Sequence, residues 1–114
     1  MKADEWVKKN GWEKAKDVVA LTKFSGWADH YNIKEDAIGT AGEIYSKKLC
    51  ENNDDFVCLH DLKRLVESHE LVEKYKNRHG GIRFRIRWGQ YRYGDTQEYI
   101  NRLKQAILDV ESCQ

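Results

Sequence analysis

Residues 80–94, "GGIRFRIRWGQYRYG", carry the strongest strand signal in this chain. Apolar side chains occupy every second position from Ile82 to Trp88, and arginines stand between them. A period of two is typical of a β-strand that has one apolar face and one polar face. The pattern therefore predicts a strand over residues 82–88 whose outer face is cationic.

The residues that follow favour a hairpin. Gly89-Gln90 suits a two-residue turn of type II′, after which residues 91–93 would return beside the first strand. Arg92 would then lie opposite Arg87, and like charges directly across a ladder are unfavourable. We therefore expect either a carboxylate nearby or a shift of register by a bulge at Gly89.

The charge of this region is segregated from the rest of the chain. Between Lys74 and Gly94 there are seven basic residues and no acidic one, although the whole chain carries only +1. Arginine favours planar, bidentate contacts with phosphates and carboxylates, and exposed tyrosines can stack on bases. The predicted binding residues are Arg83, Arg85, Arg87, Tyr91, Arg92 and Tyr93.

Three interpretations of this cationic face stay open. Its arginines could pair with carboxylates of neighbouring elements and form an ordinary solvated surface. The face could bind a polyanion such as nucleic acid. It could instead bind an acidic protein partner, because arginine and tyrosine are common anchors of protein interfaces.

A second nucleic-acid candidate is "ADHYNIKEDAIGTA", residues 28–41, whose small and apolar positions resemble the spacing of a helix-turn-helix. Asn32 would take the positive φ of the turn. Against this interpretation, Gly39 and Gly42 would lie inside the recognition helix, and Glu35 and Asp36 would face phosphates.

The other segments predict helices and one short strand. We expect a short helix, a turn at Asn10-Gly11 and a second helix to about Lys23, with the flanking tryptophans packed on the core. Residues 43–49 and the strand 56–59 could form a hairpin. A helix capped by Asp61 would follow, with a break at Ser68. The last helix would begin at residue 95 or 96, with Glu98 in a capping box, and bury five apolar residues: Tyr99, Ile100, Leu103, Ile107 and Val110.

These elements predict an α+β fold with helices packed on one side of a small antiparallel sheet and with helical N- and C-termini. The length of 114 residues and the absence of proline and of Ser/Gly-rich stretches predict a single domain over residues 1–114. An edge strand of the small sheet could pair with its copy, so a homodimer is a further expectation.

Composition limits the compartment. No apolar run approaches the length of a membrane span, and the N-terminus has no apolar signal core, so we expect no membrane association. Three cysteines without a repeated short spacing favour reduced thiols in a cytoplasm.

Catalysis is not indicated. The residues that could form a metal site lack the tight paired spacing of structural zinc, and a Cys58–His60 pair has no activating third group. We therefore expect a protein that is not an enzyme and that uses no metal or cofactor. The metal candidates considered were Cys50, Cys58, His60, His69 and Cys113.

Three segments carry a resemblance: "WVKKNGWEKAKDVV" (6–19), "DLKRLVESHELVEKY" (61–75) followed shortly by Gly-Gly, and "LKQAILDVESC" (103–113). Together they resemble small early proteins encoded by lambda-like temperate phages of enteric bacteria. The resemblance covers about half of the chain and excludes residues 24–55 and the arginine-rich segment. It implies an accessory role in the cytoplasm of a bacterial host cell and does not imply a reaction.

Overall fold

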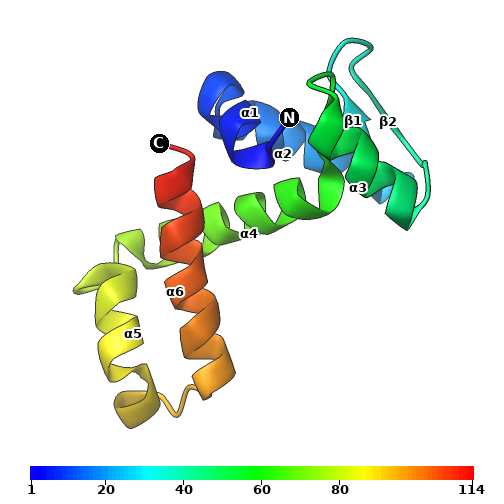
Figure 1. Ribbon diagram of the computed structural model, residues 1–114. Coiled ribbons are helices and arrows are strands. Elements are labelled where there is room, and N and C mark those ends of the chain that lie inside the picture. The colour runs from blue at the N-terminus through cyan, green and yellow to red at the C-terminus, as the bar shows by residue number, and fades with distance from the viewer. The chain divides into compact units, whose positions relative to one another are not determined.

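The structure, a computed structural model, describes residues 1–114 and confirms an α+β fold with helical N- and C-termini and a small antiparallel sheet (Figure 1). The chain forms two compact units, residues 1–66 with Cys113 and residues 67–112 with Gln114, and each is described by itself below. The elements are α1 (Ala3–Asn10), α2 (Trp12–Ala20), the 3-10 helix η1 (Leu21–Lys23), β1 (His30–Asn32), β2 (Ala37–Gly39), α3 (Glu43–Asn52), β3 (Phe56–Cys58), α4 (Leu59–Lys76), α5 (Gly81–Arg92) and α6 (Gln97–Ser112).

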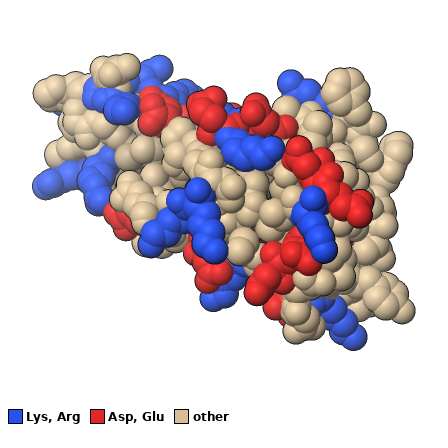
Figure 2. All heavy atoms as spheres, turned by 90° about the horizontal axis from the view of Figure 1, so that it is seen from above, with Lys and Arg blue, Asp and Glu red and all other residues tan.

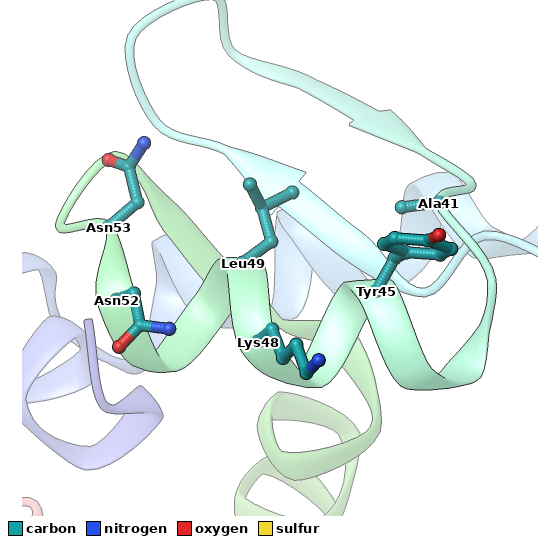
Figure 3. A pocket seen from close by; sticks show the side chains of 6 residues that line it. All are labelled: Ala41, Tyr45, Lys48, Leu49, Asn52 and Asn53. Carbon is teal, nitrogen blue, oxygen red and sulfur yellow. The ribbon is translucent and has the colours of Figure 1, made fainter.

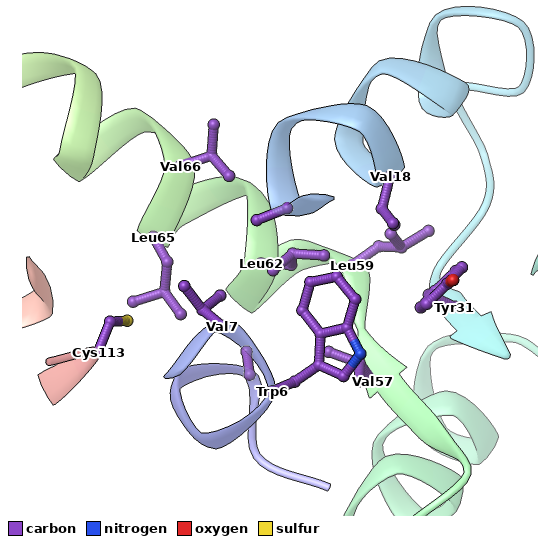
Figure 4. Packing of buried hydrophobic residues seen from close by; sticks show 12 residues of the cluster. Trp6, Val7, Val18, Tyr31, Val57, Leu59, Leu62, Leu65, Val66 and Cys113 are labelled. Carbon is purple, nitrogen blue, oxygen red and sulfur yellow. The ribbon is translucent and has the colours of Figure 1, made fainter. Parts of the chain in front are cut away.

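The core of the N-terminal unit is built around Trp6, which is 1% exposed. Its ring meets the ring of Tyr31 edge-on, with centroids 5.6 Å apart (Figure 4). The predicted turn at Asn10-Gly11 is confirmed, because Gly11 has a φ of 86° and separates α1 from α2. The predicted packing of both tryptophans is confirmed too, with Trp12 half-buried against the same cluster.

The sheet has the strand order β2-β1-β3, and all its pairs are antiparallel. Tyr31 pairs with Ile38 on one side and with Val57 on the other. The short strand predicted at residues 56–59 is therefore confirmed, but its partner is β1. The predicted pairing of this strand with residues 43–49 is wrong, because those residues lie in helix α3. This helix buries Ser46 and Cys50, which are four residues apart on one face.

The helix-turn-helix predicted for residues 28–41 is also wrong, because this segment forms the β1–β2 hairpin. Gly39 lies in β2 against the His30 ring, where an added Cβ would come within 2.9 Å of His30 Nε2. The residue with positive φ is Asp36, at 50°, and not Asn32. The Asp36 carboxylate accepts hydrogen bonds from the Tyr31 hydroxyl and from Lys14 Nζ.

The α-amino group of Met1 caps the C-terminal end of α3. It donates to the backbone carbonyls of Cys50 at 2.7 Å, Asn53 at 3.0 Å and Phe56 at 3.0 Å. The last carbonyls of a helix have no intrahelical partner, and a cation is favourable at that end of the helix dipole. The first residue of the chain thereby joins α3 to the start of β3.

The core of the C-terminal unit contains Tyr75, Ile82, Leu103 and Ala106. The last helix is confirmed as α6, although its N-cap is Thr96: Thr96 Oγ1 accepts a hydrogen bond of 3.1 Å from the Tyr99 backbone N–H. Ile100 and Leu103 are buried as expected, whereas Tyr99, Ile107 and Val110 are half-buried.

Helix α4 departs from the prediction in two ways. It begins at Leu59, so that Asp61 lies in its first turn and not at the N-cap. It also continues through Ser68, because the hydroxyl of this buried side chain donates to Asp109 Oδ2 at 2.6 Å and accepts from Arg102 Nη1 at 3.0 Å. Because these two hydrogen bonds satisfy the Ser68 hydroxyl, it does not compete for the backbone hydrogen bonds of α4, and the helix continues.

The predicted strand over residues 82–88 is wrong: these residues lie within helix α5. Ile82 and Ile86 are four residues apart, so an alternating pattern that contains both also satisfies the spacing of a helix face. Arginine is a good helix former, and the helix removes the unfavourable Arg87–Arg92 pairing of the hairpin. Gly89 is not a turn residue but a buried helix position, where an added Cβ would lie 2.3 Å from Asp95 Oδ2.

Two tyrosines should ionise late. Burial, followed by the hydrogen bond to Asp36, raises the pKa of Tyr31 to about 12, and burial with the Tyr75 hydroxyl bond raises the pKa of Tyr99 to about 12. A pKa raised on folding contributes stability below the unfolded value of about 10, which is lost as the pH rises toward the folded value. The number of ionised tyrosines can be followed by absorbance near 295 nm. At about pH 11, the folded chain should have about two fewer ionised tyrosines than the chain unfolded in concentrated guanidinium. Tyr31→Phe should remove half of that difference, and identical titration curves would contradict the assignment.

Candidate functional site

The predicted binding residues do not share one face. Arg83 is exposed on α5 and pairs with Glu111 at 3.3 Å. Arg87 is exposed, with its guanidinium 5.5 Å from the Trp88 ring. The cationic strand face that the sequence predicts is therefore absent, because a helix directs these side chains around its axis.

Arg85 makes the strongest ion pair of α5. Its Nε and Nη2 donate to the Asp95 carboxylate at 2.6 and 2.8 Å, a bidentate arrangement with both side chains largely buried. The hydrogen bonds from Arg85 hold the pKa of Asp95 below its usual range, against the opposing effect of burial, and the same bonds raise the pKa of Arg85. This pair joins the middle of α5 to Asp95 in the short loop before α6.

The structure does bring Arg85, Arg92 and Tyr93 together, in a hollow of about 150 Å³. Its lining contains three arginines together with aromatic side chains. We call this site the Arg–aromatic hollow. It is lined by Tyr75, Arg78, His79, Gly81, Phe84, Arg85, Arg92 and Tyr93.

Each guanidinium of the hollow lies near a ring. The distance from guanidinium carbon to ring centroid is 5.6 Å for Arg78 over Tyr75, 5.7 Å for Arg92 over Phe84 and 4.0 Å for Arg85 over Tyr93. Such contacts are worth about 0.5–1 kcal/mol at exposed sites and orient the planar group. Each guanidinium group of the hollow therefore lies within cation–π range of an aromatic ring.

Two of these cations have no carboxylate partner. Neither Arg78 nor Arg92 has an Asp or Glu oxygen within ion-pair distance, whereas the opposite charge on Arg85 comes from Asp95. His79 meets the Phe84 ring edge-on, with centroids 5.7 Å apart. The hollow thus has a local excess of positive charge that the C-terminal unit does not neutralise by direct pairing.

Elsewhere the surface charge is mixed. On the face drawn in Figure 2, Lys and Arg side chains are interspersed with Asp and Glu, and no area of one sign extends across it. This agrees with the net charge of +1 and gives no continuous track for a long polyanion on that face. Recognition of an anion would have to be local.

The N-terminal unit has an apolar surface of its own on α3. Ile44 and Tyr45 are 72% and 73% exposed, and the Tyr45 ring lies beside Ala41 at one end of a hollow of about 580 Å³ (Figure 3). Large exposed apolar side chains that lie together mark interaction sites more often than isolated ones do. Phe24 and Trp27, in the loop before β1, are also exposed. The α3 hollow is lined by Ala41, Tyr45, Lys48, Leu49, Asn52 and Asn53.

The cysteine and histidine candidates are not assembled into a metal centre. No group of three His, Cys, Asp or Glu side chains is placed to hold a metal ion. Cys58 ends β3 and His60 lies in the first turn of α4, so the two do not project from one strand, although both line a hollow of about 400 Å³ with Asp29. His69 lies in the middle of α4, and Cys50 and Cys113 are buried.

The Asp29 carboxylate is held in its ionised form. Burial would raise its pKa, but the hydrogen bonds from His30 Nδ1 at 2.8 Å and from the backbone N–H groups of Ala41 and Gly42 lower it below the usual range. These bonds tie β1 to the segment before α3. They account for the carboxylate as part of the fold.

Comparisons of the chain with protein-family models, with curated proteins and with solved structures found no match. Function must therefore be argued from the residues themselves. None of the helices combines the length and apolarity needed to cross a bilayer.

Sequence reasoning missed Tyr75, Arg78, His79 and Phe84 as site residues. The run without acidic residues from Lys74 to Gly94 was the available signal, since it includes Arg78. The strand interpretation places Phe84 on the apolar face, opposite the arginines, and leaves Arg78 at the end of the preceding helix, outside the predicted site. Only the helical arrangement of α5 brings these side chains against Arg92.

Proposed function

We propose that this chain acts by binding, without catalysis, and that the Arg–aromatic hollow holds a phosphate of a single-stranded nucleic acid. The observation that carries the proposal is the placement of Arg78 and Arg92, two guanidinium groups without carboxylate partners, over aromatic rings in one hollow. Guanidinium groups match the geometry of phosphate oxygens, and Arg clusters are a recurrent means of phosphate recognition.

Exposed tyrosines next to the hollow support nucleic acid as the carrier of that phosphate. Tyr91 is 87% exposed and Tyr93 is 55% exposed, and they flank Arg92 in the chain. Stacking of a base on an aromatic side chain contributes about 1–3 kcal/mol in proteins that bind single strands. A short stretch of strand could thus be held by phosphate contacts and by stacking outside the hollow.

The test is a fluorescence anisotropy titration with a short labelled single-stranded oligonucleotide. The double variant Arg78→Gln/Arg92→Gln should bind about tenfold more weakly, because each charge-assisted hydrogen bond is worth about 1.5–3 kcal/mol and water replaces part of it. Both side chains are exposed, so the fold should be unaffected. Lys8→Gln/Lys9→Gln, which removes the same charge from exposed positions of α1, is the matched control.

Salt gives an independent readout of the same binding. Because the hollow holds one phosphate, raising the salt from about 50 to 200 mM should weaken binding about threefold, with a slope of about 0.7 for the one phosphate neutralised on a single strand. The double variant should show a smaller salt dependence, since fewer phosphates are contacted. Binding that is absent, or equal in the variant and the wild type, would exclude the hollow as a nucleic-acid site.

A second candidate function is binding of a protein partner, and the α3 hollow favours it. Its exposed Tyr45, next to Ile44, is typical of an interface anchor, and Lys48 offers a cation to an acidic partner. A complex that survives nuclease treatment and is lost on Tyr45→Ala, but persists in Arg78→Gln/Arg92→Gln, would support this function. The acidic host protein predicted from the sequence would then bind α3 and not the arginines.

The setting of either function stays a prediction. The resemblance to early proteins of lambda-like phages implies an accessory role in the cytoplasm of a bacterial host cell. A homodimer through an edge strand would have to use β2 or β3, which are the two edges and have three residues each. Sedimentation at several concentrations decides whether the chain self-associates.

A further inference from the structure

We infer that the phosphate taken by the Arg–aromatic hollow is a terminal one, the phosphate monoester at the end of a strand, and not an internal phosphodiester. This inference rests on the proposed function and names the chemical class of its ligand. Three observations support it: the size of the hollow, the number of N–H donors without a partner, and the positions of the guanidinium groups next to the rings that line the hollow.

The size of the hollow suits a single group that enters end-on. It measures about 150 Å³ and has rings of Tyr75, Phe84 and Tyr93 in its wall. An internal phosphodiester has a sugar on each side, so its chain must both enter and leave the site. A terminal phosphate has one such connection and can occupy a small hollow while the rest of the strand stays outside.

The free donors suit a dianion. Arg78 and Arg92 are unpaired, and Arg85 donates to Asp95 through Nε and Nη2, which leaves its Nη1 without a hydrogen bond. Three guanidinium groups therefore offer N–H donors to the same small volume. A phosphate monoester carries about −1.5 to −2 charges and three acceptor oxygens, whereas a diester carries one charge and two free oxygens.

A guanidinium group lies near each of three rings that line the hollow. The guanidinium groups of Arg78, Arg92 and Arg85 lie over Tyr75, Phe84 and Tyr93 respectively. Arg85 at 4.0 Å blocks base stacking on one side of the Tyr93 ring, and Tyr75 is only 3% exposed, so these two rings leave little room for a base inside the hollow. Exposed Tyr91, next to Arg92 in the chain, is free to take the first base outside.

The experiment compares three labelled oligonucleotides of one sequence, with a 5′-phosphate, with a 3′-phosphate or with hydroxyl groups at both ends. At least one phosphorylated strand should bind about tenfold more tightly than the hydroxyl strand, which corresponds to about one charge-assisted hydrogen bond. The Arg78→Gln/Arg92→Gln variant should bind the phosphorylated strand no more tightly than the hydroxyl strand. The Lys8→Gln/Lys9→Gln variant should keep the tenfold difference in affinity between the two strands.

The contrary outcomes separate the two levels of the proposal. If all three strands bind equally and lose affinity in the Arg78→Gln/Arg92→Gln variant, the hollow binds internal phosphates, and the inference fails while the proposed function stands. If no strand binds, the proposed function fails as well. A phosphotyrosine peptide that binds more tightly than every oligonucleotide would assign the hollow to a phosphorylated protein and overturn the inference.

Discussion

Trp6→Ala is expected to lower the free energy of unfolding by about 3–5 kcal/mol, the usual cost of removing a fully buried aromatic side chain. Trp6 is 1% exposed, and its ring supports Tyr31 of the central strand β1. Because small domains are stable by only about 5–15 kcal/mol, the variant should be close to unfolding at room temperature. Urea denaturation followed by far-ultraviolet circular dichroism measures the change.

The chain has a matched control in Trp27, which is 75% exposed. Trp27→Ala removes the same side chain without opening a cavity and should change the free energy of unfolding by less than about 0.5 kcal/mol. Equal urea midpoints for the two variants would show that Trp6 is not the centre of this core.

Gly89→Val is expected to destabilise the chain by about 3 kcal/mol, the upper end of the range for overpacking. An added Cβ would lie 2.3 Å from Asp95 Oδ2 and 3.0 Å from Ile100 Cδ1. The Asp95 carboxylate cannot move aside freely, because both its oxygens are bonded to Arg85. The substitution should therefore separate α5 from α6 and also weaken binding at the Arg–aromatic hollow.

Gly26→Val is the control for this prediction. Gly26 has an ordinary φ and nothing within 4 Å of an added Cβ, so its replacement should have little effect on the thermal midpoint. If Gly89→Val were as stable as Gly26→Val, residues 81–92 could not be a helix that packs against α6 through Gly89. The same variants thus test the largest error of the sequence-based prediction.

The helical ends of the chain could be predicted because local signals and burial agree there. Gly11 offers the positive φ that ends α1, and Trp6 lies on the apolar face of the preceding helix. In α6, Thr96 can cap and Ile100 and Leu103 recur at helical spacing, so propensity, capping and pattern indicate the same element. In these segments the sequence pattern alone is enough to predict the helix.

Helix α5 could not be predicted because its pattern is ambiguous. Apolar residues at every second position include the pair Ile82 and Ile86, whose spacing of four also fits a helix, so the same residues satisfy both patterns. The feature that decides between them is the close approach of Gly89 to Asp95 in the loop before α6 and to Ile100 in α6. Such a contact depends on residues outside the stretch and cannot be read from the stretch itself.

The site was predicted in composition but not in geometry. The excess of arginine between Lys74 and Gly94 indicates the cationic and aromatic composition that the Arg–aromatic hollow has in the structure. Which arginines are unpaired depends on where Glu111 and Asp95 lie, and these acids come from later parts of the chain. Of the residues predicted from the sequence, Arg85, Arg92 and Tyr93 line the Arg–aromatic hollow. Arg78 lines it as well, whereas Arg83 and Arg87 do not.

Helix α5 places Arg92 with Arg78 in the Arg–aromatic hollow and directs Arg83 and Arg87 elsewhere. Arginine Nε–Hε resonances of the ¹⁵N-labelled chain can be followed during titration with whichever terminally phosphorylated oligonucleotide binds more tightly. The signals of Arg78 and Arg92 should shift while those of Arg83 and Arg87 stay unchanged. Shifts of Arg83 and Arg87 together, with Arg78 and Arg92 unaffected, would show instead that the ligand binds a face of alternating residues.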